Sequence, residues 1–409
     1  TASSGLPVSY SIASGPATLS ANTVTLTGTG VVTVRVAQSG NANYNAAANV
    51  DQQFTVAKAS QTIAFAALAD KIFGDAPFGL SATANSGLAV TFSVVSGPAT
   101  ISGSTVTLTG AGTVVVRASQ PGNANYEAAA DVDRSFTVAK ANQTISFAAL
   151  PNKAFGSAPF ALSATASSGL AVSFSIISGP ATLSGSTVTL TGIGTVIVRA
   201  AQAGNANYNA AANVDQPFTV SKGGQTIAFA VLADKVFGDA PLGLTATSDS
   251  GLAVIFSIVS GPATISGSTV TLTGAGTVVV RASQPGSANY EAAADVDRSF
   301  TVAKASQTVS FAALPNKAFG SAPFALSATA SSGLAVSFSI ISGPATASGS
   351  TVTLTGIGTV TVRAAQAGNA NYNAAANVDQ SFTVSKGGQT ITFAVLADKV
   401  FGDAPLGLT

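Results

Sequence analysis

The sequence contains no cysteine, histidine, methionine or tryptophan. Without cysteine the chain can form no disulfide bond, no thiolate metal site and no thiol nucleophile. Without histidine it lacks the commonest general base and the commonest metal ligand of proteins. We therefore expect a protein that is not an enzyme, with no catalytic residue and no cofactor.

Charged residues are also scarce. Asp, Glu, Lys and Arg make up 8% of the 409 residues, whereas about 25% is usual. The net charge is +1, and the basic residues are scattered singly, so no basic stripe points to nucleic acid as a partner. The longest apolar runs are only a few residues, so this segment is not expected to insert into a membrane.

The abundant residues favour β-structure. The chain is 46% hydrophobic with 41 glycines, and its polarity comes mainly from Ser, Thr and Asn. Val172, Phe174 and Ile176 alternate with serines, and Val196 and Val198 alternate with residues that would face outward. Such period-two patterns mark strands with one buried face, and Gly- and Pro-containing turns separate them. About seven short strands in about 80 residues predict an antiparallel β-sandwich.

The sequence repeats itself with a period of 82 residues. The repeats begin at Gln61, Gln143, Gln225, Gln307 and Gln389. We predict four complete modules, at 61–142, 143–224, 225–306 and 307–388. Residues 1–60 align with a module that lacks its first two strands, and residues 389–409 align with those first two strands.

Two types of module alternate along the chain. Modules 61–142 and 225–306 contain "LADK" followed by "FGDAP", whereas modules 143–224 and 307–388 contain "LPNK" followed by "FGSAP". Only about two residues separate the last strand of one module from the first of the next. Such a short link should limit bending, so the fold class is a tandem array that forms a rod or fibre.

The residues of one module resemble a known family. "QTISFAALPNKAFGSAPFALSATASSGLAVSFSIISGPATLSGSTVTLTG" followed by "GTVIVRAAQAGNANYNAA" is similar to the bacterial immunoglobulin-like tandem repeats of large surface or secreted proteins. The similarity is to the mostly-bacterial-Ig and invasin-like types, and it covers the whole chain. It implies Ig-like β-sandwiches, an extracellular or cell-surface location, and a role as a stalk, spacer or fibre. It supplies no catalytic residues.

Five of the six tyrosines lie in copies of the phrase Gly-Asn-Ala-Asn-Tyr or its variant Gly-Ser-Ala-Asn-Tyr. Tyr126 and Tyr208 are candidates for stacking on a sugar. The alternative is structural: the glycine turns the chain, the asparagines bond nearby backbone, and the tyrosine covers the open end of the core. Ser287 replaces the first asparagine in one copy, which argues against strict ligand geometry.

A second candidate site is a group of carboxylates. Glu127, Asp131 and Asp133 are spaced so that they could hold Ca²⁺, which needs six to eight oxygen ligands. The alternate module has Asn209, Asn213 and Asp215 at these positions. A solvated, polar strand end is the competing interpretation, and no metal site is predicted beyond this candidate.

The two incomplete modules leave two hypotheses open. The chain is an excerpt from a longer array, or the tail of one chain completes the head of the next by strand addition. Residues 389–409 are of the "LADK" type whereas residues 1–60 end in "NAAANVDQ", the other type, which argues against a matched fit.

The sequence therefore predicts a non-enzymatic structural component of a bacterial extracellular stalk or filament. Its partners would be other copies of itself, in head-to-tail or lateral contacts. The alternative is a multivalent adhesin or glycan-binding repeat, in which weak sites gain avidity. A glycan or host surface could be a separate partner, reached through regions outside this segment.

Overall fold

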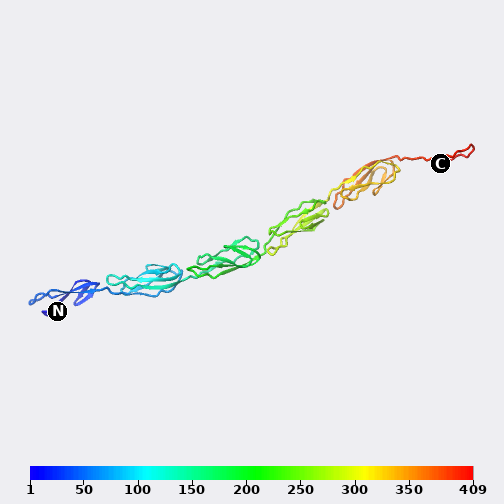
Figure 1. Cartoon of the computed structure of the whole chain (residues 1–409). Helices are drawn as coiled ribbons and strands as arrows, with labels where there is room; N and C mark the ends of the chain where they lie inside the picture. Colours follow the sequence, from blue (N-terminus) through cyan, green and yellow to red (C-terminus); the bar gives the residue numbers. More distant parts are fainter. Residues whose placement is uncertain (409) are drawn as a thin grey trace. The chain divides into compact units, whose positions relative to one another are not determined.

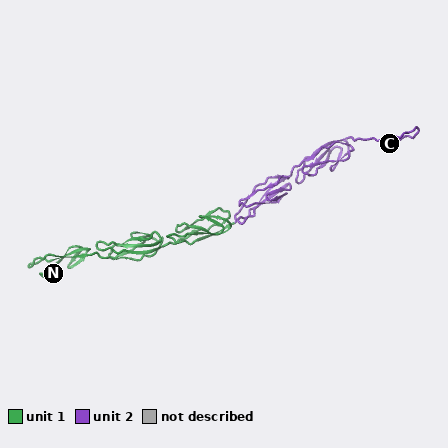
Figure 2. Cartoon of the chain, in the orientation of Figure 1, with its two compact units in different colours: residues 1–221 green, residues 222–409 purple. Residues whose placement is uncertain are grey.

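The computed structural model describes residues 1–408, and all regular structure in this range is β-strand. The chain divides into two compact units, Thr1–Ser221 and the part from Lys222 onward (Figure 2). Each unit consists of consecutive β-sandwiches joined by short linkers (Figure 1). None of the described residues belongs to a helix with the length and apolarity needed to cross a bilayer.

The second sandwich shows the complete arrangement. Its strands are β15 (Ile145–Phe147), β16 (Lys153–Ala154), β17 (Phe160–Ala161), β18 (Ala164–Ala166), β19 (Ser173–Ser178), β20 (Ala181–Ser184), β21 (Thr187–Leu190), β22 (Gly194–Ala201) and β23 (Val214–Ser221).

These strands form two layers with the strand order of an immunoglobulin-like sandwich. One layer has the order β16-β23-β22-β19, in which β16 is parallel to β23 and the other pairs are antiparallel. In the other layer β15 pairs with β18, and β17-β21-β20 continue the sheet. Strands β17 and β18 are two halves of one interrupted strand. In the usual lettering of immunoglobulin domains, the second layer therefore contains strands A, B, E and D, and the first layer contains strands C, F and G.

The same order recurs in three further complete sandwiches. The first consists of β6 (Ile63–Phe65), β7 (Lys71–Ile72), β8 (Phe78–Gly79), β9 (Ala82–Ala84), β10 (Thr91–Ser96), β11 (Ala99–Ser102), β12 (Thr105–Leu108), β13 (Gly112–Ser119) and β14 (Val132–Ala139). The third consists of β24 (Ile227–Phe229), β25 (Lys235–Val236), β26 (Leu242–Gly243), β27 (Ala246–Ser248), β28 (Ile255–Ser260), β29 (Ala263–Ser266), β30 (Thr269–Leu272), β31 (Gly276–Ser283) and β32 (Val296–Ala303). The fourth consists of β33 (Val309–Phe311), β34 (Lys317–Ala318), β35 (Phe324–Ala325), β36 (Ala328–Ala330), β37 (Ser337–Ser342), β38 (Ala345–Ser348), β39 (Thr351–Leu354), β40 (Gly358–Ala365) and β41 (Val378–Ser385).

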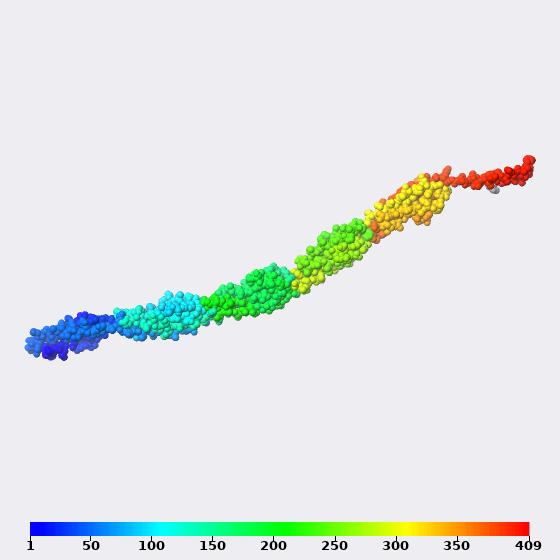
Figure 3. Space-filling view, viewed as in Figure 1, coloured from blue at the N-terminus to red at the C-terminus, as the bar shows by residue number. Residues whose placement is uncertain are grey.

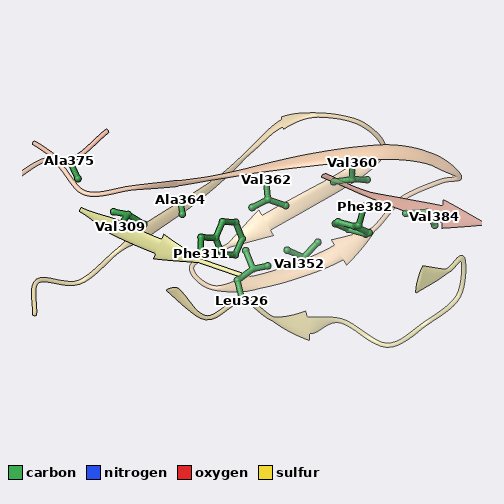
Figure 4. Close-up of a cluster of buried hydrophobic side chains, with 10 residues drawn as sticks. All are labelled: Val309, Phe311, Leu326, Val352, Val360, Val362, Ala364, Ala375, Phe382 and Val384. Carbon is green, nitrogen blue, oxygen red and sulfur yellow. The ribbon is translucent and has the colours of Figure 1, made fainter. Parts of the chain in front are cut away.

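Each complete sandwich has its own hydrophobic core between the two layers. In the fourth, Phe311 and Leu326 from one sheet meet Val362 and Phe382 from the other (Figure 4). The inward valines of the two long strands are buried while their neighbours on the outer face are half-buried or exposed. The alternation in the sequence thus predicted the strands and their faces, and the all-β prediction of tandem Ig-like sandwiches is confirmed.

Two strands of the second sandwich were not predicted from the sequence pattern. Ala181–Ser184 (β20) follows a Gly-Pro turn directly and is too short to show alternation. Lys153–Ala154 (β16) lies in a segment expected to be a loop, but it pairs in parallel with Val220 and Ser221 at the edge of the sheet. A two-residue strand carries no periodic signal, so only the partner strand shows where it belongs.

The first 60 residues form a partial sandwich. Its strands are β1 (Ser9–Ser14), β2 (Ala17–Ser20), β3 (Thr23–Leu26), β4 (Gly30–Ala37) and β5 (Val50–Val56). They correspond to the last five strands of a complete sandwich, with β1-β4-β5 in one sheet and β2-β3 in the other.

Residues 389–408 contain no strand, although their sequence corresponds to the first strands of a sandwich. The equivalent segments elsewhere become strands by pairing with the second and last strands of their own sandwich. The tail keeps one local feature, a turn in which Asp403 and Val400 bond each other. The turn forms without partners, whereas the strands need them.

Candidate functional site at the junctions between sandwiches

The Gly-Asn-Ala-Asn-Tyr loop joins the last two strands of each sandwich, and its first asparagine builds the turn. In the second sandwich Asn205 Oδ1 accepts hydrogen bonds from the amides of Asn207 and Tyr208, at 2.8 and 2.9 Å. In the third sandwich Ser287 Oγ accepts the same two bonds at 3.2 Å each. Serine therefore replaces asparagine here without loss of the turn, as expected for the structural interpretation of this residue.

The second asparagine of the loop contacts the preceding sandwich instead. Asn207 Oδ1 accepts a hydrogen bond of 2.9 Å from the amide of Ala111, in a Gly-x-Gly turn of the first sandwich. Asn371 Oδ1 accepts the equivalent bond from Ala275 at 2.9 Å, and Asn125 Oδ1 accepts one from Thr29 at 3.1 Å. Three junctions within the two units thus share one contact between residues 96 apart.

The linker between two sandwiches is bound by the same loop. The amide of Ala141 donates to the carbonyl of Asn207, and the amide of Asn209 donates to the carbonyl of Ala141, both at 2.9 Å. This forms a parallel bridge between Ala141 and Tyr208. Equivalent bridges join three more pairs: Ala59 with Tyr126, Gly223 with Tyr290, and Ala305 with Tyr372. The linker is therefore held as a short extra strand beside the loop.

A lysine and an aromatic pair complete the junction. Lys140 Nζ donates to the carbonyl of Asn205 at 2.7 Å, and Lys304 makes the equivalent bond to Asn369. The ring of Phe73, in the first sandwich, meets the ring of Tyr208 edge to face, with centroids 5.5 Å apart. Such pairs contribute about 0.5–1.5 kcal/mol beyond burial. We call this set of contacts the loop clamp: the loop of one sandwich bound to the linker and to the Gly-x-Gly turn of the preceding one.

The glutamine at the first position of each repeat forms a second set of hydrogen bonds that holds the linker. Gln143 is buried, and its Nε2 donates to Gln202 Oε1 at 2.8 Å and to the carbonyl of Asn209 at 2.7 Å. Its Oε1 accepts a bond from Ser168 Oγ. Among the described residues no buried side-chain polar atom lacks a partner, so burying this amide leaves no unpaired polar group.

The structure places the two predicted ligand-contact tyrosines in the clamp. Tyr126 and Tyr208 are both half-buried at junctions. Because Tyr208 already packs against Phe73, one face or edge of its ring is used within the protein. Sugar binding by these residues stays a prediction without a supporting contact.

The three carboxylates proposed for Ca²⁺ are engaged differently. Arg117 donates to both oxygens of Asp133 at 2.8 Å, and it also lies 3.4 Å from Asp131. The hydrogen bond from Arg117 lowers the pKa of Asp133. Glu127 lies in the loop that binds the linker, where its amide donates to Ala59. A guanidinium beside two of the three carboxylates opposes a cation, and the described residues contain no group of three acidic ligands positioned for a metal.

Reasoning from the sequence missed the clamp because its partners lie in different repeats. One signal was available in the copies themselves. The second asparagine is present in all five loops, whereas the first is replaced by Ser287 in one. The asparagine that is identical in all five copies makes the contact between sandwiches at the three described junctions, whereas the position that varies builds the turn.

No family model matches the chain, and no curated protein matches it. Solved structures with similar tandem folds include Drosophila N-cadherin EC1-4, with 11% identity, a TM-score of 0.22, and coverage of 73% of this chain and 92% of that one. The human desmocollin-1 ectodomain has 10% identity, a TM-score of 0.28, and coverage of 82% and 81%. Immunoglobulin domains 1-4 of Sidekick-1 have 12% identity, a TM-score of 0.23, and coverage of 80% and 99%. These values do not assign the chain to a family.

Proposed function

We propose that this chain is a non-enzymatic structural component in which loop clamps hold consecutive β-sandwiches at set orientations. The observation that carries the proposal is the bond from the second loop asparagine to the preceding Gly-x-Gly turn. A protein that must transmit position along its length needs resistance to bending at its junctions, and the clamp supplies it at the three junctions where this bond is described.

The energetic argument follows from the number of contacts. Pivoting one sandwich about the linker would break the bridge at Ala141, the bond from Asn207 and the bond from Lys140. Each such hydrogen bond contributes about 0.5–1.5 kcal/mol net. Several broken together make a bent junction a minor state, since about 1.4 kcal/mol corresponds to a factor of ten in population.

The proposal also covers the location of the protein and the way in which its copies assemble. We place the chain in a bacterial extracellular stalk or filament, as its resemblance to bacterial Ig-like repeats implies. Head-to-tail assembly by strand complementation belongs to the same proposal.

The rival role as a glycan-binding adhesin has less support. It relied on tyrosines that could stack on sugars, and four of the five loop tyrosines bridge a linker. Any adhesive activity would then lie in surfaces other than these loops.

The clamp can be tested by measuring the distance between two sandwiches in the full chain. Since the chain has no cysteine, the exposed residues Thr100 and Thr182 can be replaced by cysteine and spin-labelled without background. Pulsed electron–electron double resonance between the two labels should give a narrow distance distribution. Asn207→Ser should broaden it, because serine is too short to keep the bond to Ala111.

The matched control is Asn205→Ser, the same substitution two residues earlier. The third sandwich carries serine at this position and keeps the turn, so the distribution should stay narrow. A distribution that is already broad in the parent chain, or that Asn207→Ser leaves unchanged, would rule out the clamp as the source of orientation.

A further inference from the structure

A hollow of about 480 Å³ lies over strands β24 and β27 of the third sandwich. Its floor carries small exposed side chains, those of Ala228, Ala230, Thr245 and Thr247. Arg298, from the last strand β32, also lines the hollow and is half-buried. The volume falls within the range of small-ligand sites, roughly 300–1,000 Å³.

The first sandwich has an equivalent hollow, of about 390 Å³, over strands β6 and β9. The residues that line it include Ala64, Ala66, Ser81, Thr83 and Arg134, each two repeats before its counterpart in the third sandwich. In Figure 3 these sandwiches are coloured blue to cyan and green to yellow-green, and each hollow is formed within one of them. The same arrangement is therefore built twice in one chain.

The arginine of each hollow is held in place by backbone carbonyls. Arg134 Nε donates to the carbonyl of Phe65 at 2.9 Å, and its Nη1 donates to the carbonyl of Asp133 at 3.2 Å. Arg298 makes the equivalent bonds, at 2.9 and 3.3 Å. Among the described residues, none accepts a hydrogen bond from Nη2 of either arginine. The guanidinium is thus oriented before a ligand arrives and keeps N–H donors for it.

The fold itself does not need an arginine at this position. The second and fourth sandwiches have Gln216 and Gln380 there. Their Nε2 atoms donate to the carbonyls of Phe147 and Phe311, both at 2.9 Å. A neutral amide therefore makes the structural bond equally well, and what the arginine adds is a positive charge with unused donors.

The charge beside the third sandwich's hollow is positive. The arginine is the only charged residue that lines it. Asp295 and Asp297 lie beside Arg281, at 3.1 and 2.8 Å, and Asp234 accepts a hydrogen bond from the amide of Thr301. These carboxylates are engaged elsewhere, so the hollow presents a guanidinium, two threonine hydroxyls and a floor of methyl groups.

We propose that Arg134 and Arg298 each bind a carboxylate of an acidic polysaccharide that lies in these hollows. A carboxylate accepts charge-assisted hydrogen bonds from a guanidinium, which are stronger than bonds between neutral groups. The exposed hydroxyls of Thr245 and Thr247, or of Ser81 and Thr83, bond the hydroxyls of the sugar, and the alanine methyl groups contact its C–H groups. Two weak sites on one chain gain avidity for a polymer that reaches both.

The hollow suits an extended peptide or a nucleic acid less well. A peptide strand would have to pair along the free edge of β24, where the arginine already bonds the carbonyl of Phe229. Single-stranded nucleic acid needs exposed aromatic rings on which its bases stack. Phe65 and Phe229, the aromatic residues of the two hollows, are each only 4% exposed.

The test is binding of the full chain to immobilised polygalacturonate, a polymer of uronic acid units, followed by biolayer interferometry at low ionic strength. We expect the parent chain to bind, to bind more weakly as salt is added, and to ignore neutral dextran. The double variant Arg134→Gln with Arg298→Gln should bind about tenfold more weakly or less, because each site loses a charge-assisted bond. Since Gln216 makes the structural bond, circular dichroism should show this variant folded like the parent.

The matched control is Lys386→Gln with Lys399→Gln, which changes the net charge equally. Both lysines are exposed and lie outside all strands, so this variant should bind like the parent. In the opposite direction, Gln216→Arg with Gln380→Arg should strengthen binding by adding two sites.

A parent chain that does not bind polygalacturonate overturns the proposal. Binding that is unchanged in the arginine variant, that falls equally in the lysine control, or that is equally strong to an oligothymidine overturns it too. This binding activity goes beyond the structural role proposed above. The spin-label distances report junction contacts that neither arginine makes, so the clamp can stand when polysaccharide binding fails.

Discussion

At the scale of single residues, two residues of the same type in one sandwich can have different structural roles. Asn205 folds its own loop, and Asn207 binds the preceding sandwich. The same contrast separates two glycines of the second sandwich. Gly179 has a φ of 102° and Gly185 a φ of 60°, yet only Gly179 lies against backbone, where an added Cβ would overlap the carbonyl oxygen of Thr195.

We therefore predict that Gly179→Ala destabilises the second sandwich more than Gly185→Ala. The left-handed conformation costs a non-glycine residue about 1–2 kcal/mol, and this cost applies to Gly185→Ala, which has open space around it. Gly179→Ala adds a collision with the next strand. Since the chain has no tryptophan, Ile177→Trp on the exposed surface can report unfolding of this sandwich in urea. Equal midpoints for the two variants would contradict the argument.

A second prediction concerns pH. Arg199 donates to both carboxylate oxygens of Asp215 at 2.7 and 2.8 Å, which lowers the pKa of Asp215. A lowered pKa in the folded state means that the pair stabilises the fold above the ordinary pKa of aspartate, about 3.9. That contribution is lost as the pH falls through the lowered value.

Asp215→Asn should accordingly lower the melting temperature of the second sandwich at pH 7 and have a much smaller effect at pH 2. Because the pair is exposed, the change at pH 7 should be modest. Asp398→Asn, in the tail outside all sandwiches, serves as the control. A melting difference that is the same at both pH values would show that the ion pair is not its source.

At the scale of elements, the linker is bound on both sides. Ala141 bridges the loop, and two residues later Gln143 reaches Gln202 and Asn209. The linker thus belongs to the sandwich that follows it. We expect these contacts, as well as the shortness of the linker, to stiffen the junction.

Removing the glutamine should loosen this arrangement. We predict that Gln143→Ala destabilises the second sandwich by about 1–3 kcal/mol, since it leaves buried polar partners unpaired. Urea unfolding followed at the tryptophan reporter measures this loss. Gln216→Ala, which removes a half-buried side chain bonded to the carbonyl of Phe147, is the comparison. A smaller loss for Gln143→Ala than for Gln216→Ala would refute the importance of the buried network.

The elements also show what sequence reasoning can reach. The long strands were predictable because inward Val196 and Val198 alternate with less buried residues. Alternation reports burial within one sandwich, so it cannot report a contact with the next. The bond from Asn207 to Ala111 spans 96 residues and uses a backbone amide as donor. A backbone donor is present at every position except proline, so nothing in the sequence marks Ala111 as the partner.

At the scale of the whole molecule, the clamps described here consist of contacts between protein groups. Their contacts are backbone bonds, an asparagine, a lysine and an aromatic pair. We predict that a chelator leaves the distance between spin labels at positions 100 and 182 unchanged, and that millimolar Ca²⁺ leaves the melting temperatures unchanged.

This experiment also tests the carboxylates at Glu127, Asp131 and Asp133. A rise in melting temperature with Ca²⁺ that disappears in Asp131→Asn would establish them as a binding site and would contradict our expectation. Mg²⁺ at the same concentration controls for general ionic effects.

The hydrogen-bond donor of the clamp, the Gly-x-Gly turn, has a consequence for how such a chain can change over generations. The amide of the middle residue of the Gly-x-Gly turn is used at all three described contacts, and that residue is Thr29, Ala111 and Ala275. The side chain adds a bond only at Thr29, whose Oγ1 donates to the carbonyl of Ala124 at 2.6 Å, and the two alanines make the contact without it. Because the asparagine binds a backbone amide, the identity of the side chain on the donating residue matters little for this bond. Any copy can then follow any other, so recombination between near-identical repeats can lengthen or shorten the gene without compensating substitutions. Copy number becomes a freely adjustable trait, and with it the reach of the protein.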